Sequence, residues 1–512
     1  LTQVAGVDQP PGRLWLGRGM TLHLEMDTHL AGTGAGGMVF ALQDFGWFLP
    51  TPGDTHHSRS ATYWGPPRYV SLLEVTDPDP WPTGVSMSID ATITVTGGTG
   101  CGPALGVEEN FGRNPALRNQ QPTQGTAGDP VDTRTGNFHY DLPGLFPPSR
   151  DLGFGFSAGY NALAASSSED VGHGWFSSLA MDLTVKADGS AVVVQEGGST
   201  VTFASTGGGG FVAPPRFSAT LVHNADGTYT FTRNHLERFV FYAEGRLVST
   251  GALGEGVVTY HYPAGSDEVD YLTDSGGQVL DVTWADGRVV EVASGSGAGG
   301  PFTVQLGYDG AGDLVSYKDV EGDVWQFAYL RHRLTEVRKP RFANTPTKLS
   351  TVYDRWGRVE QQTTASGLTF SFEYLDSSTR VRYSDGMIRD DVFSGDRRMS
   401  THLSGTTEGG VTSWTYDDDT LAVSSATDPA DHVTRFVNDG RGNPTKITDP
   451  SGRVTRIVYN AFDQPTRVEV GETAAPLPVS TAAVVATEYT YDSVGRLVSA
   501  TQAAGTPDES VT

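Results

Sequence analysis

An aromatic residue recurs through the second half of the chain about every twenty-one residues, often followed by Asp and then by a glycine turn. Weaker copies fill the gaps, so the series, here called the ladder, runs Tyr242, Tyr262, Trp284, Tyr308, Tyr329, Tyr353, Tyr374, Phe393, Tyr416, Asn438, Tyr459, Tyr491. The clearest units are Tyr308-Asp309 with Gly312, Tyr353-Asp354 with Gly357 and Arg358, Asn438-Asp439 with Gly442, and Tyr491-Asp492 with Gly495 and Arg496. A fixed period of this length indicates a repeat architecture.

Each unit predicts a β-hairpin. In residues 491–502 one strand ends at Tyr491-Asp492, Gly495 supplies a positive φ for the turn, and Arg496 begins the alternation of the next strand. A single hairpin is at best marginally stable in water, so every unit needs neighbours on both sides. We therefore expect one continuous curved sheet, with the ladder rings stacked along one of its faces. The alternative for any single position is an ordinary tyrosine of a β-meander.

The composition predicts an all-β protein. Of 512 residues, 64 are Gly and 29 are Pro, and no long amphipathic helical pattern is present. Residues 1–100 alternate in the manner of a small β-sandwich, and residues 101–127 read as a linker. The fold class is thus an N-terminal β-sandwich followed by a spiralling antiparallel sheet of hairpins.

The charge and the single cysteine exclude several classes of protein. Asp and Glu total 60 against 35 Lys and Arg, a net charge of −25 that repels nucleic acid and anionic membranes. Cys101 is alone, so no internal disulfide is possible, and no run of eighteen apolar residues predicts a membrane span. Because the chain opens at Leu1, we expect a processed or partial product, and its composition is typical of an exported bacterial protein.

Two motifs carry a resemblance to a family. Residues 128–145 read GDPVDTRTGNFHYDLPGL and residues 159–175 read GYNALAASSSEDVGHGW. They resemble the domain that introduces the repeats of Rhs proteins, and the ladder units resemble the YD repeats of the same proteins, which are related to teneurins and to the C components of insecticidal toxin complexes. The motif residues are Gly128, Asp129, Pro130, Val131, Asp132, Thr135, Gly136, Asn137, Tyr160, Asn161, Gly174 and Trp175.

The resemblance covers residues 128–502 and implies an architecture. It divides the chain further into an introducing domain at 128–183, irregular hairpins of the shell at 184–300 and YD repeats at 301–512. In such proteins the strands spiral into a hollow shell that often encloses a C-terminal toxin, and a closed sheet protects its edges. This chain shows no Asp-Pro-rich autoproteolysis box and no toxin domain before Thr512, so we expect the remainder elsewhere or an open scaffold.

Several polar clusters are candidate sites, and each has a structural alternative. Asp129, Asp132, Thr135 and Asn137 offer oxygen ligands for Ca²⁺, although such residues also form turns. His173 lacks the nearby serine or cysteine of a nucleophilic arrangement, so we expect it to be structural. His56 and His57 are expected in a solvated polar loop rather than at a metal. Residues 417–419, three aspartates, predict an acidic hairpin tip.

Tyr63, Trp64 and Trp81 form a possible binding platform. They are flanked by prolines and glycines within the predicted sandwich, where aromatic rings suit a sugar or a partner peptide. The alternative is that they pack in the core.

Three functions follow from these patterns. The first is a β-shell segment of a secreted or surface-delivered protein that encases or presents a toxin or another polypeptide, without cofactor, metal or catalysis. The second is an adhesin that binds glycans or proteins through the amino-terminal domain on a rigid repeat stalk. An enzyme such as a glycosidase needs a pair of carboxylates in a cleft, and no motif selects such a pair. We therefore expect polypeptide partners or further repeat segments, no nucleic acid and no membrane span.

Overall fold

The computed structural model describes residues 114–117 and 125–511, apart from 296–301, 341–347, 396, 406–408, 472–484 and 504–509. Of the residues before 114 it describes only the backbone of the strands. The chain divides into two compact units, Leu1–Ala104 and Leu105–Thr512. Tyr63, Trp64, Trp81 and Cys101 lie outside the described residues. Among those described, the one helical element is a short 3-10 turn, η1 (Ala162–Ala164), and none is long and apolar enough to cross a membrane.

The first unit contains three small antiparallel sheets, ordered β1-β6, β5-β2-β8 and β4-β3-β7. Its strands are β1 (Arg13–Leu16), β2 (Thr21–Ala31), β3 (Val39–Leu42), β4 (Gly46–Phe48), β5 (His56–Thr62), β6 (Arg68–Ser71), β7 (Glu74–Thr76) and β8 (Ser86–Thr96). The prediction of a loop at His56 and His57 is wrong, because the two residues begin β5 opposite Asp27 and Met26. β5 is the edge of its sheet, where a polar strand is well tolerated.

The second unit begins with short strands and one four-stranded sheet, ordered β16-β17-β18-β19. The strands are β9 (Thr126–Ala127), β10 (Val131–Asp132), β11 (His139–Asp141), β12 (Ala158–Asn161), β13 (Ser168–Glu169), β14 (Gly172–His173), β15 (Trp175–Ser177), β16 (Asp182–Val185), β17 (Ala191–Val194), β18 (Thr200–Gly207) and β19 (Gly210–Val212).

Part of the predicted linker belongs to this packed region. Asn114 and Ala116 are fully buried, which corrects the expectation of a connector there. The Asn114 side chain donates a hydrogen bond to the Thr200 carbonyl (2.7 Å) and accepts one from Gln195 (2.8 Å). A buried amide that is satisfied in this way fixes the segment against the core.

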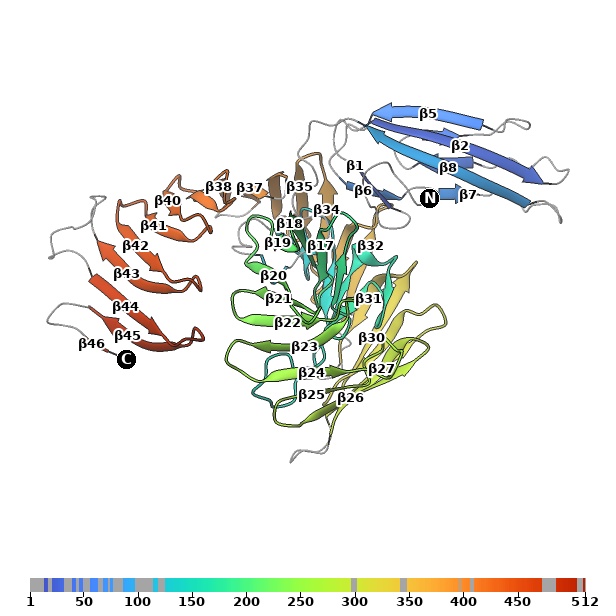
Figure 1. Ribbon diagram of the computed structural model, residues 1–512. Coiled ribbons are helices and arrows are strands. Elements are labelled where there is room, and N and C mark those ends of the chain that lie inside the picture. The colour runs from blue at the N-terminus through green and yellow to red at the C-terminus, as the bar shows by residue number, and fades with distance from the viewer. Residues whose placement is uncertain are drawn as a thin grey trace. The chain divides into compact units, whose positions relative to one another are not determined.

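The rest of the chain forms one antiparallel sheet of 27 strands in strict chain order, β20 to β46 (Figure 1). Its strands are β20 (Ala219–His223), β21 (Tyr229–Arg233), β22 (Glu237–Phe241), β23 (Leu247–Ala252), β24 (Val257–His261), β25 (Tyr271–Thr273), β26 (Val279–Ala285), β27 (Arg288–Ser294), β28 (Thr303–Tyr308), β29 (Leu314–Lys318), β30 (Val324–Leu330), β31 (Arg333–Arg338), β32 (Lys348–Tyr353), β33 (Val359–Thr363), β34 (Thr369–Tyr374), β35 (Ser378–Tyr383), β36 (Ile388–Ser394), β37 (Arg397–Ser404), β38 (Gly410–Tyr416), β39 (Val423–Thr427), β40 (Val433–Asn438), β41 (Pro444–Thr448), β42 (Val454–Tyr459), β43 (Pro465–Gly471), β44 (Val485–Tyr491), β45 (Leu497–Gln502) and β46 (Ser510–Val511). The all-β prediction and the continuous sheet of hairpins are confirmed.

Most repeat hairpins turn through a short loop that ends in glycine, and Asp431 and Asp463 take that place in two others. In the Asp309 turn, Gly312 N–H donates to the Asp309 carbonyl (3.1 Å) and Gly312 has a φ of 85°. The pairing register shifts by one residue next to the ladder residue, at Tyr308, Tyr353, Asn438 and Tyr491. Such a bulge increases the local twist of a strand pair, so a repeat of bulged hairpins curves the sheet.

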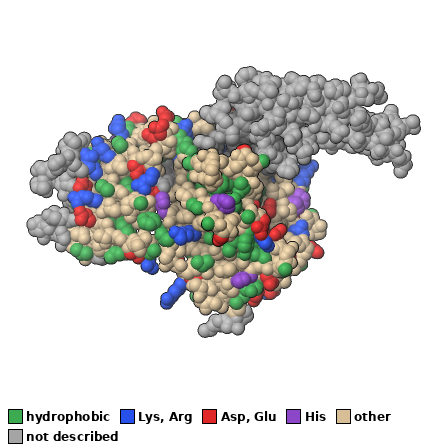
Figure 2. All heavy atoms as spheres, in the orientation of Figure 1, with side chains coloured by type: hydrophobic (Ala, Val, Ile, Leu, Met, Phe, Trp, Pro, Cys, Tyr) green, Lys and Arg blue, Asp and Glu red, His purple; other side chains and the backbone are tan. Residues whose placement is uncertain are grey.

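The curved sheet surrounds the short strands at the start of the unit. Figure 1 shows the teal segment inside the curve formed by the green and yellow strands. One hydrophobic core joins Phe138, Trp175 and Phe203 of that segment to sheet residues such as Leu306 and Phe327. Some apolar side chains face outward, and Val437 and Val458 are each 55% exposed. Figure 2 shows exposed apolar side chains among polar ones.

The curvature brings late turns of the sheet against early ones. His235, between β21 and β22, lies 2.6 Å from a carboxylate oxygen of Asp463, between β42 and β43. A Cβ on Gly254, between β23 and β24, would meet the side chain of Val494, between β44 and β45. The sheet therefore returns to its own beginning through contacts between turns.

The Asp439 turn contains two glycines, of which only one has a positive φ, so the need for glycine can be tested within one turn. Gly442 has a φ of 86°, whereas a Cβ on Gly440 meets nothing within 4 Å and its φ is not positive. We expect Gly442→Ala to lower the free energy of unfolding by about 1 to 2 kcal/mol. Gly440→Ala should leave it unchanged or raise it by about 0.4 to 1 kcal/mol. Urea unfolding of both variants measures this, and equal effects would contradict the assignment of the turn.

Candidate functional site

Nine of the ladder residues each connect a repeat to the one before it through a hydrogen bond. Tyr353 Oη donates to the carbonyl of Leu334 (2.6 Å), which lies just after the preceding hairpin turn. The same bond joins Tyr262 to Leu247 (2.9 Å), Trp284 to Val269 (2.8 Å), Tyr308 to Val289 (2.7 Å), Tyr374 to Val359 (2.7 Å), Tyr416 to Arg398 (2.6 Å), Asn438 to Val423 (3.0 Å), Tyr459 to Pro444 (3.2 Å) and Tyr491 to Pro465 (2.8 Å). Asn438 fits the ladder because its amide is also a donor.

The rings of the ladder do not stack on one another, which corrects the expected arrangement. Ladder residues occupy every second strand of most of the sheet, a separation of about 9.6 Å, which is too far for ring contact. Arginines from intervening turns lie over several rings instead. The Arg358 guanidinium carbon is 4.3 Å from the centroid of Tyr374, and that of Arg246 is 4.8 Å from the centroid of Tyr262.

Burial keeps the tyrosine hydroxyls protonated. It raises the pKa of Tyr308, Tyr353 and Tyr374 well above the ordinary value. A hydroxyl that stays protonated remains a donor at every physiological pH. The ladder is therefore a permanent set of donors.

The aspartate after the ladder residue holds the turn. Asp492 Oδ1 accepts hydrogen bonds from the backbone N–H groups of Val494 (3.0 Å) and Arg496 (2.9 Å). Asp309, Asp354 and Asp439 accept the same two bonds in their turns. Asn460 replaces the aspartate in one repeat with the same geometry. The turn thus needs an acceptor at this position, which an amide also supplies.

The introducing motif is built around a similar turn. Asp132 Oδ1 accepts from the N–H groups of Arg134 (2.9 Å) and Thr135 (2.7 Å) and from the Thr135 hydroxyl (3.0 Å). Asp417 and Thr420, at the predicted acidic tip, repeat this arrangement. The Asn137 amide donates to Asn161 (3.1 Å), and its oxygen accepts from the N–H of Leu163. Oxygens of Asp132, Thr135 and Asn137 accept hydrogen bonds from within the two motifs, as the turn-forming alternative requires, and Asp129 lies 4.0 Å from Lys339.

The motif docks on the repeat sheet through its glycines and backbone. The N–H of Val359 donates to the Gly136 carbonyl (2.9 Å), and a Cβ on Gly136 would meet Arg358 and the Tyr374 hydroxyl. Next to it, the N–H of Asp129 donates to Gln362 (2.6 Å). A Cβ on Gly128 would collide with that same Gln362 side chain. Pro130 and Val131 lie between these contacts, and Val131 is fully buried.

Tyr160 and Trp175 anchor the second motif to β30 and β31. Both side chains are fully buried, with ring centroids 5.4 Å apart. Trp175 Nε1 donates to the hydroxyl of the ladder residue Tyr329 (3.0 Å), and Tyr160 Oη accepts from the N–H of Leu334 (2.9 Å). A Cβ on Gly174 would meet the Tyr160 ring. The packed corner expected from the sequence is present.

His173 stacks on His332 with ring centroids 3.7 Å apart. Burial, with His332 and Arg288 adding to it, lowers its pKa. His332 in turn lies 2.9 Å from Asp313. His173 is therefore part of the contact between the introducing domain and the sheet.

One group of three carboxylates within 4.8 Å is found among the described residues. It comprises Asp319, Glu321 and Asp323, in the turn between β29 and β30. Glu321 and Asp323 are exposed, and Asp319 Oδ1 accepts the N–H groups of the other two. The group is an ordinary capped turn of this repeat.

The inner face of the sheet changes its burial along the chain. Two residues before the ladder position lie Leu306, Phe327, Thr351, Phe372 and Asp391, which are all buried. From β38 onward the same position holds Trp414, Phe436, Ile457 and Tyr489, which are only half-buried. We call these last four residues the open face. The sequence pattern does not predict this change, because large apolar residues occupy the position both before and after the cover beneath them ends.

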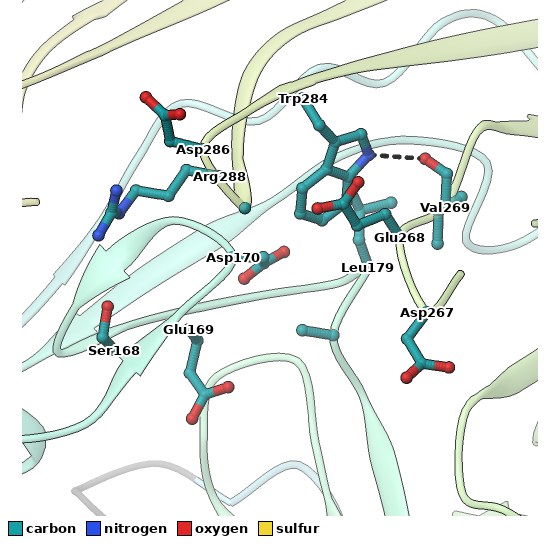
Figure 3. A pocket seen from close by; sticks show the side chains of 12 residues that line it. Ser168, Glu169, Asp170, Leu179, Asp267, Glu268, Val269, Trp284, Asp286 and Arg288 are labelled. Carbon is teal, nitrogen blue, oxygen red and sulfur yellow. Dashed lines mark hydrogen bonds between the residues drawn. The ribbon is translucent and has the colours of Figure 1, made fainter. Parts of the chain in front are cut away.

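A pocket of about 320 Å³ lies where the β13–β14 hairpin meets two turns of the sheet (Figure 3). Its polar lining comprises Ser168, Glu169, Asp170, Asp267, Glu268, Asp286 and Arg288, and Trp284 is also in the wall. Sequence reasoning missed this site because its five acids are divided among three separate turns, where acids are common. Only the fold brings the three turns together.

The hydrogen bond of a ladder tyrosine can be tested by removing one oxygen. Tyr353→Phe leaves the Leu334 carbonyl without its donor, so we expect the free energy of unfolding to fall by about 1 to 2 kcal/mol. Tyr383→Phe is the matched control, since the Tyr383 hydroxyl has no hydrogen-bond partner among the described residues. Urea unfolding of the two variants gives the comparison. Similar losses would mean that ring packing, and not the hydrogen bond, connects the repeats.

The capping aspartates make the sheet sensitive to acid. Backbone N–H donors lower the pKa of Asp417, Asp428 and Asp492. A lowered folded pKa adds stability above the unfolded value, about 3.9, and this stability is lost as the pH falls further. We expect the urea midpoint to drop below about pH 4.

The drop should be smaller in the Asp428→Asn, Asp492→Asn double variant, because Asn keeps the acceptor as Asn460 does. Asp418→Asn is the control, since the Asp418 carboxylate accepts no hydrogen bond in the described part of the chain. An unchanged acid response in the double variant would contradict the role of these caps.

Family models match parts of the introducing domain and of the repeats. Residues 128–203 match a domain of unknown function, DUF6531, and residues 308–341 and 439–473 match the RHS Repeat. A search of curated proteins gives no match.

Among solved structures, TcdB2-TccC3-Cdc42 has a TM-score of 0.42 and 12% identity, covering 63% of this chain and 19% of that chain. TcdB2-TccC3 has a TM-score of 0.41 and 13% identity, covering 72% and 21%. A Photorhabdus luminescens Tc holotoxin pore gives 0.32 and 12%, covering 70% and 24%. The chain spans about a fifth of the length of the first two. With two RHS repeats and the DUF6531 domain in a chain that builds one uninterrupted sheet of the same hairpins, the resemblance to Rhs/YD-repeat proteins is confirmed.

Proposed function

We propose that this chain is a segment of a β-shell that encases or presents another polypeptide, such as a toxin, outside the cell. Its action is steric: the wall separates the enclosed chain from its surroundings, and no bond is made or broken. The continuous sheet supports a wall of this kind, because every strand between β20 and β46 is paired on both sides and protected from other chains. The net charge of −25 suits an exported, soluble surface.

The open face is the observation that carries the proposal. Trp414, Phe436, Ile457 and Tyr489 repeat the position that the introducing domain covers earlier in the sheet. Covering apolar surface contributes about 25 cal/mol per Å², so a row of large side chains favours an apolar occupant. A row with the period of the strands suits an extended polypeptide better than a compact small molecule. The adhesin alternative rests on Tyr63, Trp64 and Trp81, outside the described residues, and stays a prediction.

Photo-crosslinking from adjacent positions tests the proposal. Benzoyl-phenylalanine is placed at position 436, on the inner face of the sheet, or at position 437, on its outer face. Val437, which it replaces there, is 55% exposed. In the native host we expect crosslinks to a polypeptide partner from 436 and few from 437, identified by mass spectrometry. Crosslinks from 437 alone, or none from 436, would remove the support for an enclosed chain.

A further inference from the structure

The pocket at the β13–β14 hairpin has an excess of negative charge that the chain does not neutralise. Five carboxylates line it, against one guanidinium, that of Arg288. Asp267 lies 3.6 Å from Arg246, outside the lining. Glu169, Asp170, Glu268 and Asp286 form no ion pair among the described residues. Arg288 lies over the ring of Tyr308, 5.8 Å from its centroid.

Asp170 is the unusual member of the lining. Its side chain is more than nine-tenths buried, and Figure 3 shows it in the middle of the labelled side chains. Oδ2 accepts a hydrogen bond from the Ser177 hydroxyl, whereas Oδ1 has no partner. A buried carboxylate oxygen without a donor costs free energy unless a cation or a proton meets it. Burial, with Glu169 adding to it, raises the pKa of Asp170 to about 7.

The spacing of the acids favours an organic cation over a metal ion. Ca²⁺ and Mg²⁺ need oxygens that converge on one point. The pocket acids do not form a group of three with ligand atoms within 4.8 Å, the spacing found at Asp319 in the described part of the chain. A guanidinium presents five N–H donors in a plane and can reach several separated carboxylates. The indole of Trp284 is held by its bond to Val269 and offers a ring to a cation.

We propose that this pocket binds the cationic side chain of a polypeptide, with Glu268 and Asp286 at its rim, Asp170 in its wall and Trp284 beside the charged group. The proposal goes beyond encasement, because it involves no residue of the open face and holds for a partner on either side of the wall. It gives the acidic chain a specific point of recognition for a basic segment.

Isothermal titration of the full chain with two short peptides tests this. Acetyl-Gly-Arg-Gly-amide carries the cation, and acetyl-Gly-citrulline-Gly-amide is its neutral isostere. At pH 8 and low salt we expect the arginine peptide to bind at least ten-fold more tightly. The advantage should shrink as salt screens the rim carboxylates. Equal binding of the two peptides would overturn the proposal.

Matched variants locate the binding. Glu268→Gln with Asp286→Asn removes two exposed charges, and Asn suits the positive φ of 51° at position 286, so the fold should persist. We expect at least a five-fold loss of affinity for the arginine peptide. Glu321→Gln, an exposed acid in another turn, should change nothing. Unchanged affinity in the rim variant would place the binding elsewhere and reject the site.

Titration with spermidine distinguishes between two ligands for the pocket, a peptide and a free polyamine. Spermidine binding that the rim variant weakens, without binding of the arginine peptide, would overturn the polypeptide assignment. Asp170→Asn gives a second readout. It keeps an acceptor for Ser177 and should weaken peptide binding at pH 8, where the carboxylate is ionised. Full affinity in that variant would contradict the role of Asp170.

Discussion

The structure depends on a hydrogen bond that crosses from one repeat to the one before it. A turn of two or four residues cannot stabilise an isolated hairpin. The conformational entropy lost when the hairpin is ordered costs more free energy than one pair of strands contributes. The ladder donor lies on its own hairpin, while its acceptor lies just after the turn of the preceding hairpin, as for Tyr353 and Leu334. Each unit therefore completes its neighbour, and the sheet can only be built as a series.

The introducing domain gives this series its core. Gly136 bonds to Val359, and Trp175 bonds to the ladder residue Tyr329, so the motif contacts the repeats through both backbone and ladder. The glycines of the motif are explained by these contacts, since side chains at Gly136 or Gly174 would displace Arg358 or Tyr160. A motif that seems to be a set of turn formers is thus a docking surface for the sheet that follows it.

The sequence predicted what repeats locally and missed what depends on distant partners. The period of Tyr-Asp and glycine predicted the hairpins, since turn chemistry is written in adjacent residues. The same period could not reveal that the tyrosine hydroxyl donates to a backbone carbonyl of the preceding repeat. Ring stacking was therefore predicted, although the ladder residues lie on alternate strands, which are too far apart for it. The acidic pocket was missed for a similar reason: Asp170, Glu268 and Asp286 are ordinary in their own turns and become a site only when three turns meet. His56 and His57 read as a loop because a polar edge strand lacks the alternation that marks a buried one.

The same repeat forms a covered inner face in the earlier part of the sheet and the open face in the later part. The same hydrogen bond to the preceding repeat is made before and after the cover ends, as at Tyr308 and Tyr491, so the wall does not need the introducing domain for its backbone. What changes is the cover: Phe372 is buried and Phe436 is not, although both stand two residues before a ladder position. Selection for stability alone would favour polar residues where nothing covers the sheet. Large apolar side chains at Trp414, Phe436 and Ile457 therefore support the proposed occupant, and the ladder would hold that surface in place without it.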